Sequence, residues 1–149
     1  MPQSYIKRIL NARVYDVARE TPIDDARLLS QRFGNRILLK REDMQPVFSF
    51  KCRGAFNKMS KLSQQELSRG VVAASAGNHA QGLALAAATL KVKATIVMPK
   101  TTPLIKVEAV RGRGAKAVLH GDTFEEAAAY AKKLVETQGL IYIPPYDDP

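Results

Sequence analysis

The feature that most constrains the fold is an alternation, from residue 71 onward, of short apolar runs with longer amphipathic stretches. The runs have the length and β-branched content of strands, and the stretches carry apolar residues at helical spacing. A parallel sheet joined by right-handed crossover helices produces this order. The predicted strands are 71–75, 94–98, 116–120 and 140–143, and the predicted helices are 78–90, 104–111 and 124–137. We therefore expect an α/β fold with an open parallel sheet.

The first 66 or so residues do not repeat this pattern. They begin with an Arg-rich helical stretch, break at Thr21-Pro22, and place Ser63 three residues before Glu66, which is the spacing of a helix capping box. The predicted elements are a helix at 25–33, a strand at 36–40, a helix at 52–62 and a short helix after Ser63. At the other end, Asp122 or Thr123 is expected to cap the last helix and Gly139 to end it.

The formal net charge of +9 raises the possibility of a nucleic-acid partner. Lysines and arginines are spread along the chain in runs of no more than two, without interleaved aromatic residues, so we expect no nucleic acid and favour a solvated surface or an anionic small ligand. One cysteine and two histidines predict neither a disulfide nor a metal site. No run reaches the ~20 apolar residues of a membrane span, and Met1 to Ser4 lack a signal layout, so we expect a cytoplasmic protein with no membrane partner.

The loop at 75–79, Ser-Ala-Gly-Asn-His, joins a predicted strand to a predicted helix, which is where ligands bind in open α/β sheets. Backbone N–H groups at a helix start favour an anion, and Gly77 permits close approach of the backbone. Ser75 and Asn78 add side-chain hydrogen bonds to a carboxylate or phosphate. A simple N-cap turn explains the same residues equally well. The loop is neither a dinucleotide fingerprint nor a P-loop.

Lys51 stands at a predicted helix start, just after Phe48 and Phe50 and close to Arg53. Apolar neighbours and nearby positive charge favour the uncharged amine that bonds a carbonyl carbon. Without further context, however, a lysine at a helix start is ordinarily a solvated surface charge. Cys52 has no histidine nearby in sequence, so we interpret it as a small buried residue rather than a nucleophile.

Three consecutive motifs resemble those of the fold-type II pyridoxal-phosphate enzymes. They lie at 39–43 (Leu-Lys-Arg-Glu-Asp), 45–55 (Gln-Pro-Val-Phe-Ser-Phe-Lys-Cys-Arg-Gly-Ala) and 75–82 (Ser-Ala-Gly-Asn-His-Ala-Gln-Gly). The likeness continues at 97–99, 118–121 and 144–149, so it covers essentially the whole chain. The Gln-Pro-Val sequence at 45–47 resembles that of the biosynthetic threonine deaminases, or threonine ammonia-lyases, more than that of their catabolic relatives.

This resemblance implies a role for each matching residue. Lys51 would hold pyridoxal 5'-phosphate covalently and later remove the α-proton of the substrate. Phe50 would pack beside the cofactor ring, and Asn78 would hydrogen-bond the ring hydroxyl oxygen. The residues implied to hold the substrate carboxylate are Ser75, Gly77, Asn78 and His79.

The implied reaction is the deamination of L-threonine to 2-oxobutanoate and ammonia, the first step of isoleucine biosynthesis, with L-serine as a secondary substrate. Related racemases place a serine where this chain has Ala76, which favours elimination over racemisation. Two alternatives remain open. One is another enzyme of the same family, such as a serine dehydratase, a racemase or threonine synthase, and the other is a truncated, non-catalytic interaction module.

The resemblance also implies that the chain is the amino-terminal part of a longer enzyme. The glycine-rich phosphate loop of the family has no counterpart in this sequence, nor does the residue that contacts the pyridine nitrogen. Residues 67–149 resemble the small α/β domain, whereas 1–66, with Lys51, would belong to the larger cofactor domain. We expect the intact enzyme to be a tetramer-like homo-oligomer, and the isolated chain to retain the cofactor weakly and to associate through exposed apolar surface.

Overall fold

The computed structural model describes residues 5–148, so the predictions that concern Met1 to Ser4 and Pro149 lie outside the described residues. Its centre is a four-stranded sheet in the order β5–β4–β3–β6, with every neighbouring pair parallel. The strands are β3 (Val71–Ala74), β4 (Ala94–Met98), β5 (Lys116–Leu119) and β6 (Ile141–Tyr142). The predicted parallel sheet is confirmed, and the strand ends differ from the prediction by one residue at most.

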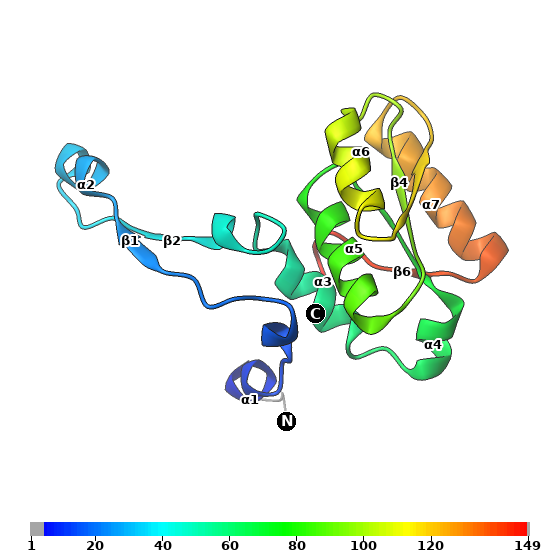
Figure 1. Ribbon diagram of the computed structural model, residues 1–149, viewed down its shortest axis with the longest axis horizontal. Helices are drawn as coiled ribbons and strands as arrows, with labels where there is room; N and C mark the ends of the chain where they lie inside the picture. The colour runs from blue at the N-terminus through cyan, green and yellow to red at the C-terminus, as the bar shows by residue number, and fades with distance from the viewer. Residues whose placement is uncertain (1–4, 149) are drawn as a thin grey trace.

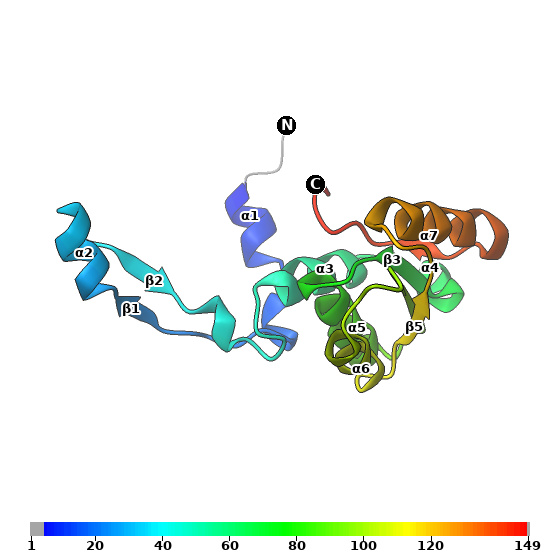
Figure 2. The same cartoon turned by 90° about the horizontal axis from the view of Figure 1, so that it is seen from above.

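Three crossover helices connect these strands: α5 (Asn78–Leu90), α6 (Leu104–Arg111) and α7 (Phe124–Gln138). They match the predicted helices closely. Helix α7 begins with the capping box of Thr123 and Glu126 and ends at Gly139, whose φ of 68° is left-handed. Seen from above, α5 and α6 lie on one side of the sheet and α7 on the other (Figure 2).

The two faces of the sheet are covered separately because successive side chains of a strand point to opposite faces. On one face, Val71 and Ala73 of β3 pack with α5 and α6. On the other, Val72 and Ala74 pack against Ala127 and further residues of α7. All four β3 residues are fully buried, as expected for a central strand of a parallel sheet.

Helix α3 (Lys51–Met59) packs against α5 on the first of these faces. Phe56 and Met59 of α3 are completely buried there, in the same cluster as Val71. The helix ends three residues earlier than predicted, at Met59, and α4 (Gln64–Arg69) follows. The predicted capping box of Ser63 and Glu66 is confirmed at the start of α4. The division into units at 1–66 and 67–149 remains a prediction.

Before α3, the described elements are α1 (Tyr5–Leu10), η1 (Val14–Asp16), β1 (Ile23–Asp25), α2 (Arg27–Phe33), β2 (Leu38–Lys40) and η2 (Glu42–Met44). The strands β1 and β2, with α2 between them, form an arm that extends away from the sheet, whereas η1 packs against α3 (Figure 1). The predicted helix at 25–33 is wrong at its start, because Ile23 to Asp25 pair with Leu38 to Lys40 as an antiparallel hairpin. No helix among residues 5–148 has both the length and the apolar character that crossing a bilayer requires.

Candidate active site

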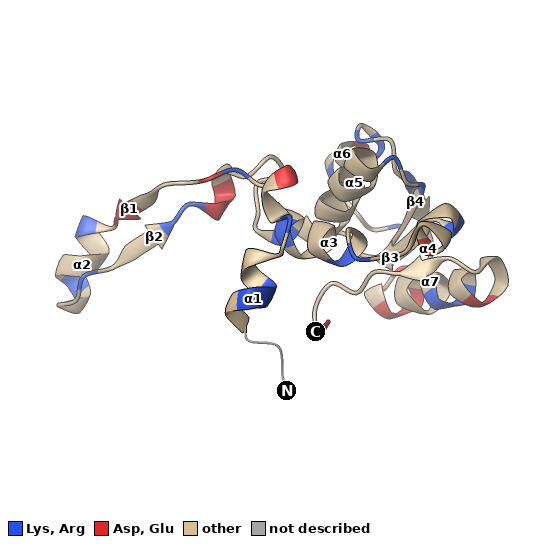
Figure 3. Cartoon of the chain, turned by 90° about the horizontal axis from the view of Figure 1, so that it is seen from below, with Lys and Arg blue, Asp and Glu red and all other residues tan. Residues whose placement is uncertain are grey.

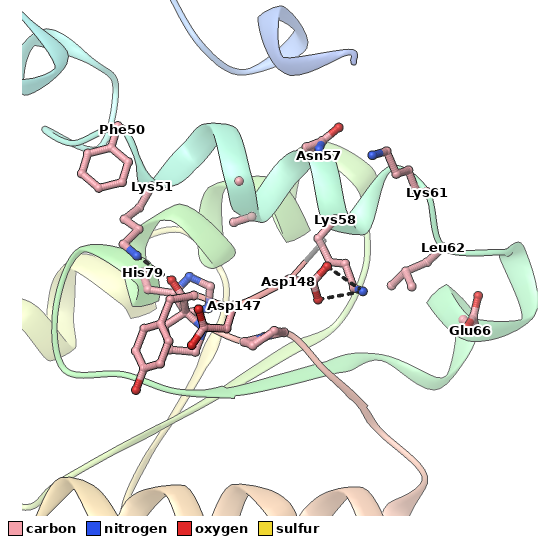
Figure 4. A pocket seen from close by; sticks show the side chains of 15 residues that line it. Phe50, Lys51, Asn57, Lys58, Lys61, Leu62, Glu66, His79, Asp147 and Asp148 are labelled. Carbon is pink, nitrogen blue, oxygen red and sulfur yellow. Dashed lines mark hydrogen bonds and ion pairs between the residues drawn. The ribbon is translucent and has the colours of Figure 1, made fainter. Parts of the chain in front are cut away.

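Lys51 is the first residue of α3, and its side chain lines a pocket of about 420 Å³. Its Nζ donates a hydrogen bond of 2.5 Å to the carbonyl oxygen of Pro145. The same nitrogen lies 5.5 Å from the centroid of the Phe50 ring, which is 58% exposed. Figure 4 shows the amine directed from α3 toward the carboxy-terminal segment. Lys51 is therefore a pocket lysine rather than an outward-facing surface charge.

The wall opposite α3 is the segment Pro144–Asp148, which follows β6. An ion pair holds this segment to α3, with 2.8 Å between Lys58 Nζ and Asp148 Oδ2 (Figure 4). His79, from the first turn of α5, completes the same pocket near Lys51. Residues far apart in sequence thus meet at one site, and the carboxyl end of the sheet supplies much of it.

The predicted anion loop leads from β3 into α5. Ser75 is 8% exposed, and its Oγ accepts hydrogen bonds from the backbone N–H groups of Gly77 at 3.3 Å and Ala80 at 3.2 Å. The Ser75 hydroxyl therefore satisfies one backbone donor in the first turn of α5, although the N-cap residue itself is Gly77. Among the described residues, no hydrogen-bond acceptor engages the backbone N–H of Asn78 or His79. These two donors, with the exposed side chain of Asn78, suit an anion at the helix start.

The imidazole of His79 is 4% exposed and lies 3.0 Å from the carbonyl oxygen of Ile143 through Nε2. A carbonyl only accepts, so Nε2 carries the proton and donates. Burial lowers the pKa of His79 below its ordinary value, and the nearby charge of Lys51 acts in the same direction. The side chain is thus a neutral brace between α5 and the chain after β6. Only the backbone N–H of His79 remains suited to hold a carboxylate.

We expect the stability of the chain to fall as the pH drops below about 6.5, because unfolded His79 then binds a proton that the folded residue resists. The unfolded state binds more protons between the lowered pKa and 6.5, so the free energy of unfolding decreases with falling pH, by up to about 1.4 kcal/mol per pH unit for one proton. Urea titrations across this range should show the slope. It should flatten in His79→Gln, and an unchanged slope in that variant would contradict the assignment.

Two neighbours of Lys51 face elsewhere. Arg53 directs its guanidinium to Glu42, with 2.8 Å between Nε and Oε2, so its charge is paired rather than turned to the lysine. Cys52 is fully buried, and desolvation raises the pKa of its thiol. The prediction of a small buried cysteine is confirmed, and a thiol in this position lacks the exposure that a nucleophilic thiolate requires.

Of the predicted site residues, the structure brings Phe50, Lys51 and His79 together as pocket walls. Ser75, Gly77 and Asn78 lie at the start of α5, next to His79 but not among the residues that line the pocket. The sequence motifs included Pro144 to Asp148 without a role, and the structure makes this segment a wall. The sequence signals for it were the family likeness at 144–149 and a turn-like run of prolines and aspartates directly after the last strand.

Known proteins similar to this chain share both its sequence and its fold. A threonine dehydratase of Nicotiana attenuata is 59% identical over 145 residues, which is 97% of this chain and 24% of that protein. The L-threonine dehydratase biosynthetic IlvA of Pasteurella multocida is 53% identical, again over 97% of this chain and 28% of its own length. The chain spans about a quarter of the length of these curated relatives.

Solved structures agree. The processed form of threonine deaminase isoform 2 from Solanum lycopersicum superposes with a TM-score of 0.93 at 57% identity, covering 97% of this chain and 40% of that one. Maize serine racemase superposes with a TM-score of 0.89 at 32% identity, covering 96% and 44%. The model of the family described as pyridoxal-phosphate dependent enzyme matches residues 14–149. The chain therefore belongs to the family of pyridoxal-phosphate dependent enzymes.

Proposed function

We propose that Lys51 is the lysine that bonds pyridoxal 5'-phosphate, and that an intact enzyme of the relatives' length uses this site to deaminate L-threonine to 2-oxobutanoate and ammonia. One observation carries the proposal. In a chain of this family, Lys51 and His79 line one pocket. The backbone N–H groups of Asn78 and His79, at the start of α5, are suited to bind an anion.

The side chains present fit the cofactor in three respects. The Lys51 amine lines the pocket, and in the structure it donates to the carbonyl of Pro145. Phe50 offers an exposed aromatic face beside that amine. Asn78 is exposed at the helix start and presents an amide for a ring hydroxyl. The pocket volume of about 420 Å³ also suits a small-molecule site.

When bound, pyridoxal phosphate supplies an electron sink that stabilises negative charge at the α-carbon of an amino acid. The residues of this chain bind the substrate, orient it and transfer its proton. The amide donors of Asn78 and His79 hold the substrate carboxylate and so fix the direction of the α-C–H bond. Once the amine of the substrate has replaced Lys51 on the cofactor, the freed Lys51 amine would take the α-proton, and Phe50 would shield one side of the reacting centre from water. The neutral, buried His79 adds no competing charge.

Elimination is favoured over racemisation because Ala76 carries no group that gives or takes a proton. A racemase needs a second acid on the opposite face of the α-carbon, and the loop offers only a methyl group at this position. Ser75, the nearest hydroxyl, is buried and already bonded by two backbone N–H groups. L-Threonine is thus the proposed substrate, with L-serine as a smaller analogue.

The test is reductive labelling. The purified chain is incubated with pyridoxal phosphate, reduced with borohydride and mapped by peptide mass spectrometry. We expect Lys51 to be labelled preferentially, and the label at this position to be absent in Lys51→Arg, which keeps the charge but cannot bond the cofactor carbonyl. The matched control is Lys58→Arg, on the same helix and in the same pocket, which should retain the label at Lys51.

Labelling spread evenly over many lysines would argue against the cofactor assignment. Activity is assayed separately, as 2-oxobutanoate from L-threonine, pyruvate from L-serine and D-serine from L-serine. Formation of D-serine without 2-oxo acids would point to a racemase instead. Specific labelling of Lys51 without any product would support Lys51 as the cofactor lysine and would indicate that turnover requires a longer chain. The curated relatives are about four times as long as this chain.

We also propose that the protein associates into homo-oligomers and works in the cytoplasm without a nucleic-acid partner. Exposed apolar side chains support association: Leu28 and Phe33 of the arm are 83% and 59% exposed, and Leu10 of α1 is 79% exposed. Lysines and arginines are distributed over the arm, α1, α3 and α7, with acidic residues among them (Figure 3). Sedimentation of the purified chain tests the association, and a compact, monodisperse monomer would count against it.

A further inference from the structure

Gly82 lies in the interior of α5, where the helix touches α3. A Cβ placed on Gly82 would lie 2.9 Å from both the carbonyl carbon and the carbonyl oxygen of Lys51, and 3.1 Å from the backbone nitrogen of Cys52. All three are main-chain atoms, so no side-chain rotation relieves the clash. Glycine is among the least favourable residues for a helix interior, and its φ at this position is not left-handed. The close approach of the two helices is therefore what requires a glycine here.

The atoms that meet Gly82 belong to Lys51 itself. Gly82 follows Asn78 by four residues, which is about one helical turn, so both lie on the same side of α5. One rigid helix thus carries the Asn78 backbone donor at its start and, one turn later, the surface against which the Lys51 peptide rests. The spacing between the lysine and the anion-suited helix start is set by this single contact.

We propose that Gly82 is a positioning residue for Lys51, holding the backbone of the cofactor lysine at a fixed distance from the start of α5. The inference rests on the proposed function of Lys51. A methyl group on residue 82 would push α3 away from α5 at the lysine, because the contact is already as close as backbone atoms allow. Displacement of a reacting group by about 1 Å can cost about 100-fold in rate.

The variant is Gly82→Ala, and the control is Ala88→Gly. Ala88 is an exposed residue of the same helix, so its replacement weakens α5 without touching α3. Both variants are examined under conditions in which circular dichroism shows that they are folded, with sucrose added if needed to favour the compact state. The first readout is the ratio of pyridoxal-phosphate label on Lys51 to label on Lys58 of the same molecules. We expect this ratio to fall on the order of tenfold in Gly82→Ala and to stay at the parent value in Ala88→Gly.

The second readout needs no cofactor. Nuclear Overhauser contacts between the Lys51 side chain and Pro145 report the hydrogen bond to that carbonyl. We expect them to weaken in Gly82→Ala only. Unchanged contacts and an unchanged labelling ratio in folded Gly82→Ala would overturn the proposal. If the parent chain shows no preference for Lys51, the cofactor assignment fails, while the loss of the contacts in Gly82→Ala still supports positioning of Lys51 by Gly82.

Discussion

Replacing Glu42 with alanine is expected to lower the free energy of unfolding at pH 7 by about 3 kcal/mol, because it removes the acceptor at the centre of a hydrogen-bond network. One oxygen of Glu42 accepts from Arg53, Gln45 and Thr21, and the other accepts from Arg53 again. The side chain is only 18% exposed. The variant leaves the Arg53 guanidinium partly buried without its counterion, two residues from the candidate cofactor lysine.

The same network makes the free energy of unfolding depend on pH. Hydrogen bonds from Arg53, opposed by desolvation and aided by Gln45 and Thr21, lower the pKa of Glu42 from 4.5 to about 2. Since a tenfold change in proton affinity is about 1.4 kcal/mol, the carboxylate contributes roughly 3 kcal/mol. A lowered carboxyl pKa stabilises the fold above the unfolded value, so this contribution is present above pH 4.5 and is lost as the pH falls from 4.5 toward 2.

Urea unfolding of the parent chain and of Glu42→Ala at pH 7, and again near pH 3, measures both effects. The difference between the two chains should be largest at neutral pH and should shrink in acid. The matched control is Asp43→Ala, which removes the next carboxylate in the chain, an exposed partner of Arg41, and should change little. Equal losses for both variants would mean that the Glu42 network contributes no more than a surface ion pair.

The sequence predicted the sheet region well because local signals there agree with one another. The β3 run of 71–74 is fully buried in the centre of a parallel sheet, and the α7 boundaries follow directly from Thr123 and Gly139. The arm was predicted less well. Three-residue strands such as Ile23–Asp25 have too few positions to show a period, and their pairing with Leu38–Lys40 depends on contacts across an intervening helix.

The candidate site was predictable to the extent that its residues lie in contiguous motifs. Lys51 and the 75–79 loop were identified in this way, but their surroundings depend on contacts between distant segments. The carbonyl of Pro145 that receives the Lys51 hydrogen bond is 94 residues further along the chain. The pairing of Arg53 with Glu42, rather than an orientation toward Lys51, is likewise decided by how η2 docks on α3. Side-chain direction of this kind follows from tertiary packing and is not encoded in local spacing.

Phe50, the residue before α3, and Phe56, within α3, have opposite environments, and exchanging each for alanine should separate stability from cofactor retention. Phe56 is completely buried in the core cluster that α3 shares with α5 and β3, whereas Phe50 is 58% exposed beside the Lys51 amine. Phe56→Ala leaves a cavity in a core that cannot fully collapse, so we expect a loss of about 3–5 kcal/mol in the free energy of unfolding. Phe50→Ala should change that free energy by no more than about 0.5 kcal/mol.

The labelling of Lys51 with pyridoxal phosphate should be affected more by Phe50→Ala than by Phe56→Ala. Under conditions where both variants are folded, Phe56→Ala should keep the preference for Lys51, because its cavity lies on the core side of the helix. Phe50→Ala should lower it, because the aromatic face beside the amine is gone. Urea titration and peptide mapping of the same samples give both quantities. A Phe50→Ala chain that labels like the parent would remove Phe50 from the proposed cofactor site, while leaving Lys51 in it.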